Sequence, residues 1–191
     1  MNDRKQRLTP PRSAVPPARP APSYVALAGE YFVLGELALR GFDGALTLGH
    51  TKEIDIFVLN RRTGLNFKVE VKTTHKGVQQ SGLFGPSYAW MMDKRHESLE
   101  ADELVYCFVS LEEGSGVRRF FLVPSKDVAA YVGWEHEYWK AHSTRRTGKI
   151  TAVRTFRIPT ETPKARTIPE PWSDGRWERF ENNWAIFGKE R

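Results

Sequence analysis

The sequence contains a single cysteine, Cys107, among 191 residues, so no disulfide can form within the chain. No apolar run reaches the roughly 18 residues that span a bilayer, and residues 1–22 contain no apolar core typical of a signal peptide. Cysteine and histidine do not recur at the spacing of zinc ligands, and no glycine-rich phosphate-binding loop follows a predicted strand. We therefore expect a cytoplasmic protein with no membrane partner and no nucleotide cofactor.

Charge is distributed unevenly along the chain. The formal net charge is +6, and two basic ends flank a mildly acidic middle. Lysine and arginine gain affinity for a polyanion by releasing the counterions of its phosphates, so basic ends around a group of acids are consistent with a nucleic-acid partner. The same distribution is also consistent with a role in solubility alone.

Composition divides the chain into three parts. Residues 1–22 hold six of the twelve prolines and few large apolar side chains, which predicts a disordered arm. Residues 23–144 are long enough for one domain with its own core. Residues 145–191 form a basic, tryptophan-bearing C-terminal extension with little periodicity. Its aromatic side chains are suited either to stacking on unpaired bases or to closing a small core.

Apolar periodicity and turn residues predict an α/β fold. In chain order the predicted elements are a helix over 23–41, strands over 45–48, 54–60 and 65–73, a helix over 88–100, strands over 104–111 and 118–123, and a helix from 124 onward. In the first helix the apolar stripe is predicted to contain Leu27, Tyr31, Leu34 and Ala38. We expect a mixed sheet of four or five strands flanked by helices, in the order α-β-β-β-α-β.

The most informative segment is Val69-Glu70-Val71-Lys72-Thr73. Because successive strand side chains point to opposite faces, Glu70 and Lys72 are predicted on one face and the two valines on the other. A salt-bridge ladder on a solvated sheet face would have the same residues, so this segment alone leaves both interpretations open.

Two further acids stand where acids are uncommon. Asp55 lies among apolar strand residues, although aspartate is depleted in strand interiors. Glu30 lies beside the apolar stripe of the first helix, whereas Glu36 has Arg40 four residues on, as in a solvated helical ion pair. A buried carboxylate is costly unless a cation accompanies it, and oxygen ligands of this kind suit Mg²⁺ or Mn²⁺. The alternatives are a glutamate that reaches water and an aspartate that caps a strand end.

The order of these motifs resembles that of the PD-(D/E)XK nuclease superfamily. The motifs are Gly29-Glu30 in a helix that ends at Gly41-Phe42, then Asp55-Ile56, then Val69-Glu70-Val71-Lys72-Thr73-Thr74. The spacing is similar to that of archaeal-type Holliday junction resolvases and other restriction-endonuclease-like proteins, and the resemblance covers about residues 24–123. Two departures are Ile54, where proline is common, and the lack of a glutamine-containing helical motif typical of the exonuclease branch.

The resemblance implies roles for these residues. Asp55 and Glu70 would ligate Mg²⁺, for which Mn²⁺ could substitute, together with the backbone carbonyl of Val71, and Glu30 would join them directly or through water. Lys72 would position and help deprotonate the attacking water, or stabilise charge on the phosphorane. The residues expected to contact the nucleic acid are Lys52, Thr73, Thr74, His75 and Lys76.

These roles predict a Mg²⁺-dependent endodeoxyribonuclease that acts on DNA as a homodimer. Two other interpretations stay open at this point. One is a DNA-binding module of the same fold that does not cleave, and the other is a nuclease-like subunit of a larger defence or recombination complex.

Overall fold

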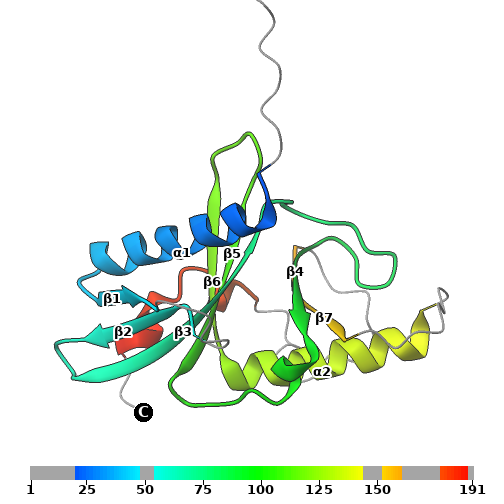
Figure 1. Cartoon of the computed structure of the whole chain (residues 1–191). Helices are drawn as coiled ribbons and strands as arrows, with labels where there is room; N and C mark the ends of the chain where they lie inside the picture. The colour runs from blue at the N-terminus through cyan, green and yellow to red at the C-terminus, as the bar shows by residue number, and fades with distance from the viewer. Residues whose placement is uncertain (1–19, 48–53, 144–151, 161–176, 189–191) are drawn as a thin grey trace, which may run out of the picture.

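The computed structural model describes residues 20–47, 54–143, 152–160 and 177–188 (Figure 1). Five strands form one mixed sheet in the order β1-β2-β3-β5-β6, in which only β3 and β5 run parallel. They are β1 (Asp43–Leu46), β2 (Ile56–Asn60), β3 (Leu65–Thr74), β5 (Leu104–Leu111) and β6 (Arg118–Pro124). The α/β class and the mixed sheet flanked by helices are confirmed.

Helix α1 (Pro22–Leu39) ends where the sequence predicts. Gly41 adopts a left-handed φ of 77° and its N–H bonds to the carbonyl of Ala38, as expected of a glycine at a helix end. The predicted apolar stripe is wrong, however, because Leu27 and Tyr31 are 42% and 58% exposed. The buried face instead contains Gly29, Val33 and Leu37, because the helix has apolar residues on several sides and its contact with the sheet decides which of them is covered.

The predicted hairpin between the second and third strands is confirmed. Strands β2 and β3 pair antiparallel, with Ile56 opposite Val69. Gly64 closes the turn with a left-handed φ of 73°, and its N–H bonds to the carbonyl of Asn60 at 2.8 Å. The register fixed by this turn determines which residues of β3 extend beyond the start of β2.

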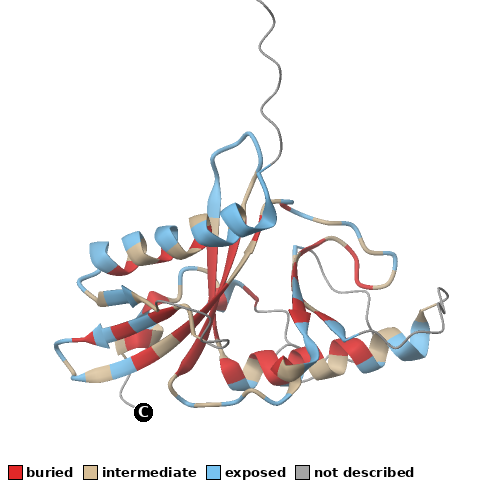
Figure 2. Cartoon of the chain, in the orientation of Figure 1, coloured by how far each residue is buried: buried red, intermediate tan, exposed pale blue. Residues whose placement is uncertain are grey.

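The central sheet separates two cores (Figure 2). On the α1 side lie alternate residues of β3 and β5, among them Val69, Val71, Val105 and Cys107. On the opposite side, β5 presents Tyr106 and Phe108 toward helix α2 (Ser125–His142) and a second, two-stranded sheet. Cys107 is a buried free thiol, as its place in an apolar strand predicts.

The second sheet contradicts one prediction. The helix expected over 88–100 is wrong: residues there form strand β4 (Ser87–Asp93) followed by the one-turn helix η1 (Lys94–Glu97). Strand β4 pairs antiparallel with β7 (Val153–Pro159). Tyr88, Trp90 and Met92 alternate inward and are buried, which is the period of a strand and not of a helix.

Part of the predicted extension packs on both cores. The described elements there are β7, η2 (Trp177–Phe180) and η3 (Trp184–Gly188). Trp177 joins the core beside α2, and Trp184 joins the core beside α1. For these two tryptophans the core-closing interpretation is therefore confirmed. The domain boundary at residue 144 stays a prediction, and nearly all of the predicted disordered arm lies outside the described residues.

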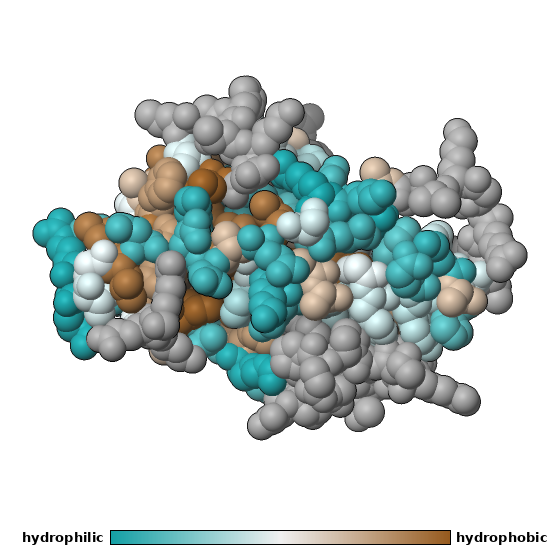
Figure 3. All heavy atoms as spheres, turned by 90° about the horizontal axis from the view of Figure 1, so that it is seen from below, coloured by the Kyte–Doolittle hydropathy of each residue, from teal (hydrophilic) through white to brown (hydrophobic). Residues whose placement is uncertain are grey.

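The surface differs between the two ends of the molecule. Apolar side chains gather at the left of Figure 3, the end where β2 and β3 lie, whereas hydrophilic ones dominate at the right, where α2 lies. On β2, Phe57 and Leu59 are among the exposed large apolar residues. No helix in the described part of the chain combines the length and the apolar character needed to cross a membrane.

Candidate active site

The candidate site lies where β3 extends past the start of β2. The ladder of backbone hydrogen bonds reaches Val69, whose carbonyl accepts the N–H of Asp55 at 2.9 Å. Beyond this point Asp55 Oδ2 accepts the N–H of Val71 at 2.7 Å, so a carboxylate takes the place of the next strand residue. Asp55 therefore does cap a strand end, and this cap fixes its side chain at the edge of β3.

The carbonyl of Val71 is directed to the same edge. In a strand the N–H and C=O of one residue point to the same side, so this carbonyl lies beside the Asp55 carboxylate. A backbone oxygen and a carboxylate oxygen thus stand together without any rearrangement of the sheet.

Glu70 and Lys72 occupy the opposite face of β3 from Val69 and Val71, as strand alternation predicts. Glu70 is only 3% exposed. Lys72 Nζ donates to Glu70 Oε1 at 2.5 Å, and the lysine side chain is itself mostly buried. A charged pair at this depth is costly to desolvate, so it contributes little to stability by itself. The solvated salt-bridge ladder is thereby wrong for this pair.

The charges of the four predicted residues influence one another. The pKa of Glu30 is raised above its ordinary value first by burial and then by the negative charges of Asp55 and Glu70, while Lys72 opposes the shift. Burial also raises the pKa of Glu70, against the lowering effect of Lys72 and Arg95. The fold has therefore brought Glu30, Asp55, Glu70 and Lys72 into one neighbourhood from three separate elements.

The predicted site supplies carboxylate oxygens, which are the kind of ligand that a hard divalent cation takes. Burial and the charges of Asp55 and Glu70 raise the pKa of Glu30, and burial raises that of Glu70, so a cation nearby would favour their charged forms; carboxylate oxygens are ligands that Mg²⁺ and Mn²⁺ accept. Within the residues that the structure describes, no group of three Asp, Glu, His or Cys side chains is arranged to hold a metal ion. Asp55, Glu70, Glu30 and the Val71 carbonyl therefore remain candidate ligands.

Glu30 owes its place to the residue before it. A Cβ atom at position 29 would lie 1.9 Å from Thr73 Oγ1, so glycine is required where α1 crosses β3. The control glutamate forms the predicted ion pair, with 2.5 Å between Glu36 and Arg40, and its side chain is 30% exposed.

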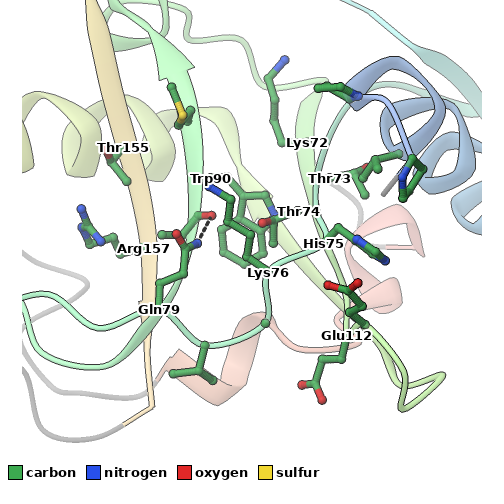
Figure 4. A pocket seen from close by; sticks show the side chains of 18 residues that line it. Lys72, Thr73, Thr74, His75, Lys76, Gln79, Trp90, Glu112, Thr155 and Arg157 are labelled. Carbon is green, nitrogen blue, oxygen red and sulfur yellow. Dashed lines mark hydrogen bonds between the residues drawn. The ribbon is translucent and has the colours of Figure 1, made fainter. Parts of the chain in front are cut away.

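A cleft of about 1030 Å³ opens beside the end of β3 (Figure 4). Lys72, Thr74, His75 and Lys76 line one wall, and Thr155 on β7 belongs to the other. The cleft is closed at its base by Trp90, whose Nε1–H bonds to the carbonyl of Val109. Thr73 also lines the cleft, whereas Lys52 lies outside the described residues.

Sequence reasoning missed one charged residue at this site. Arg95 on η1 approaches Glu70, with 4.0 Å between Nη2 and Oε1. The incorrect helix over 88–100 concealed it, since such a helix places Arg95 on one stripe with Tyr88 and Leu99 and not near β3. Reading Tyr88, Trp90 and Met92 as a period of two would have placed the strand end at Asp93.

His96, the next residue, makes a pH-dependent contribution to stability. It is 1% exposed and its Nδ1 lies 2.7 Å from the hydroxyl of Tyr106. Burial lowers its pKa from 6.5 to about 4, with Lys72 and Arg95 adding to the shift. Between these pH values the unfolded chain takes up a proton that the folded protein does not. We therefore expect the free energy of unfolding to fall as the pH drops from 6.5 toward 4, by about 3 kcal/mol.

Urea unfolding at several pH values measures this contribution. His96→Asn keeps an acceptor near the Tyr106 hydroxyl but does not titrate, so its unfolding free energy should depend less on pH than that of the wild type. Identical pH profiles for the two proteins would show that His96 is not the responsible group.

Comparison with known proteins places the fold. No family model matches the sequence, and no curated protein matches it. Among solved structures, the chain is similar to the bacterial homing endonuclease I-Ssp6803I, with a TM-score of 0.51 and 15% sequence identity. The match covers 88% of this chain and 92% of that one. At this identity the likeness shows a shared overall fold.

Proposed function

We propose that this protein is a metal-dependent endodeoxyribonuclease of the PD-(D/E)XK superfamily. One observation carries the proposal: the buried Lys72–Glu70 pair lies at the strand edge that Asp55 caps, and Glu30 interacts electrostatically with all three residues. The shared fold supports it, because the similar structure is that of a homing endonuclease.

Each residue has a distinct role in the proposed reaction. Asp55, Glu70 and the Val71 carbonyl would hold Mg²⁺, with Mn²⁺ as a substitute, and Glu30 would join them directly or through water. The bound metal supplies Lewis-acid polarisation of the phosphate and a lowered pKa of its water. Lys72 Nζ, which lies against Glu70 in the structure, orients the attacking water and places a positive charge beside the phosphate.

The cleft supplies a path for the DNA backbone. Thr74, His75 and Lys76 follow Lys72 along one wall of the cleft, where we propose that they contact phosphates of the DNA backbone. Thr73 and Lys52 complete the proposed contact set. Two copies of the chain would be needed to cut both strands at once, and we propose a homodimer for this reason.

A supercoiled plasmid provides the direct test. With Mg²⁺ the protein should convert it to nicked or linear DNA, and EDTA should prevent the conversion. An intact plasmid across a series of Mg²⁺ and Mn²⁺ concentrations, with duplex, branched and single-stranded substrates also uncut, would refute the proposal.

Glu30 and Glu36 offer a matched comparison on one helix. Glu30→Gln should lower the cleavage rate by about tenfold, because it removes a negative charge beside the proposed metal ligands. Glu36→Gln, which removes the solvated partner of Arg40, should leave the rate within about twofold of wild type. Initial rates of plasmid nicking measure both. Equal rates for the two variants would remove Glu30 from the site.

A second function is favoured by one observation. Lys72 already neutralises Glu70, and the described residues contain no three-ligand metal group. A DNA-binding module that does not cleave would have the same two features. Isothermal titration calorimetry distinguishes the two functions. Binding of Mg²⁺ that is lost in Asp55→Asn supports the nuclease, whereas salt-dependent DNA binding without metal affinity supports the module.

A further inference from the structure

The one-turn helix η1 holds Arg95 in a fixed position next to the proposed site. At its start, Asp93 Oδ1 accepts the N–H of Arg95 at 2.9 Å, and at its end the N–H of Ser98 bonds to the carbonyl of Arg95 at 3.2 Å. His96, buried against Tyr106, anchors the same turn to β5. Since Tyr106 pairs with Glu70 in the sheet, this anchor determines where Arg95 meets β3.

Two cations face one carboxylate here. Glu70 Oε1 accepts a hydrogen bond from Lys72 Nζ at 2.5 Å and lies 4.0 Å from Arg95 Nη2. A single buried carboxylate neutralises only one of these two positive charges. Glu70 has almost no contact with solvent, so counterions from solution cannot neutralise the other charge through it. Glu70 alone therefore cannot neutralise both cations, and Asp55 and Glu30 supply the other negative charges of this neighbourhood.

Arg95 also has unused hydrogen-bonding capacity. Its Nε is buried and has no hydrogen-bond partner among the residues that the structure describes. At 4.0 Å the contact with Glu70 is too long for a hydrogen bond, although the side chain is 38% exposed and so reaches the solvent-facing side of the site. An anion that arrives there would find a planar group of donors already in place.

The chemistry of this group suits a phosphate, the anion that the proposed DNA substrate carries. A guanidinium presents parallel N–H groups that match two oxygens of one phosphate, which an ammonium cannot do. Both cations also act on the same neighbour, since Lys72 and Arg95 each lower the pKa of His96. Their mutual repulsion is relieved when a negative group lies between them.

We propose that Arg95 is a phosphate-binding residue, which with Lys72 grips the non-bridging oxygens of a DNA phosphodiester at the cleavage site. This inference rests on the proposed nuclease function. The competing interpretation is that Arg95 only screens the charge of Glu70. That interpretation predicts no direct contribution of Arg95 to DNA binding.

The salt dependence of binding separates the two interpretations. The affinity of a fluorescein-labelled DNA duplex for the full chain is measured by anisotropy in EDTA between low and physiological salt. Loss of one phosphate contact decreases the magnitude of the negative slope of log K against log salt by about 0.9. We expect this decrease for Arg95→Gln, together with a loss of about tenfold or more in Mg²⁺-dependent cleavage.

Two variants serve as controls. Arg95→Lys retains the charge and should keep the wild-type salt slope while cleaving at an intermediate rate, because it lacks the planar fork. Arg61→Gln is the same chemical change in the turn before β3, where Arg61 pairs with Asp43. It should leave both slope and cleavage within error of the wild type. Circular dichroism verifies that each variant is folded. If Arg95→Gln is unfolded, the salt slope and the cleavage rate of Arg95→Lys decide between the two interpretations.

The possible results separate the role of Arg95 from the proposed nuclease function on which it rests. A wild type that neither binds nor cuts DNA overturns both. A wild type that cuts, with an unchanged salt slope in Arg95→Gln, overturns only the role of Arg95, whatever its cleavage rate. If Arg95→Gln is unfolded and Arg95→Lys has the wild-type salt slope and cleavage rate, the role of Arg95 is also overturned. The planar guanidinium would then make no difference to the reaction.

Discussion

Lys72→Ala and Glu70→Gln are each expected to lower the rate of plasmid cleavage by about 10²- to 10⁴-fold. Lys72 supplies the only ammonium that contacts Glu70 among the described residues, and its removal takes away the charge proposed to stand beside the phosphate. Glu70→Gln removes a carboxylate from the proposed metal ligands while keeping its shape. Its affinity for Mg²⁺, measured by calorimetry, should fall as well.

The same face of β3 carries a matched control pair. Lys68 Nζ contacts Glu103 Oε1 at 2.9 Å, and both side chains are more exposed than the Lys72–Glu70 pair. Lys68→Ala and Glu103→Gln should therefore leave cleavage within about twofold, as expected when a surface ion pair is removed. Thermal unfolding excludes a general loss of structure. Cleavage that survives in Lys72→Ala, or that falls equally in Lys68→Ala, would contradict the assignment of the site.

The sequence predicted the part of the site that local alternation controls. Glu70 and Lys72 share a face because β3 is a regular strand, and Asp55 is adjacent because a four-residue turn sets the register of the hairpin. Both facts follow from residues close together in sequence. Their chemical roles, in contrast, came from a resemblance and remain proposals until metal binding and cleavage are measured.

The orientation of α1 could not be predicted in the same way. Leu27, Tyr31 and Leu34 form an acceptable apolar stripe, and so do Val33 and Leu37 with Gly29. The helix buries the second set because glycine permits close approach to Thr73, a residue more than forty positions away in the sequence. A contact of this kind is invisible to periodicity, which counts side chains and gives glycine no weight.

The segment 88–100 was predicted incorrectly for a related reason. Alanine, methionine and arginine favour helices, but strand β4 is stabilised by its pairing with β7, some sixty residues later in a part of the chain that seemed unpatterned. Because of that error, the proximity of Arg95 to Glu70 was not predicted. Its meeting with Glu70 depends on the strand ending at Asp93, whose side chain caps η1.

Gly29→Ala should destabilise the protein and reduce cleavage together. The new Cβ would lie 1.9 Å from Thr73 Oγ1, so α1 must move away from β3 or Thr73 must be displaced. Overpacking of this kind costs about 1–3 kcal/mol, which urea denaturation measures. A displacement of about 1 Å at Glu30 would lower the cleavage rate by up to about 10²-fold.

Gly35, on the same helix, is the matched control because nothing lies within 4 Å of a Cβ atom placed there. Gly35→Ala should raise the free energy of unfolding by up to about 1 kcal/mol, since alanine favours the helix more than glycine does. Adding Thr73→Ala to Gly29→Ala removes the clashing hydroxyl and should restore part of the stability. If Gly29→Ala instead behaved like Gly35→Ala, the helix would not depend on close contact with β3, and the position of Glu30 would need another explanation.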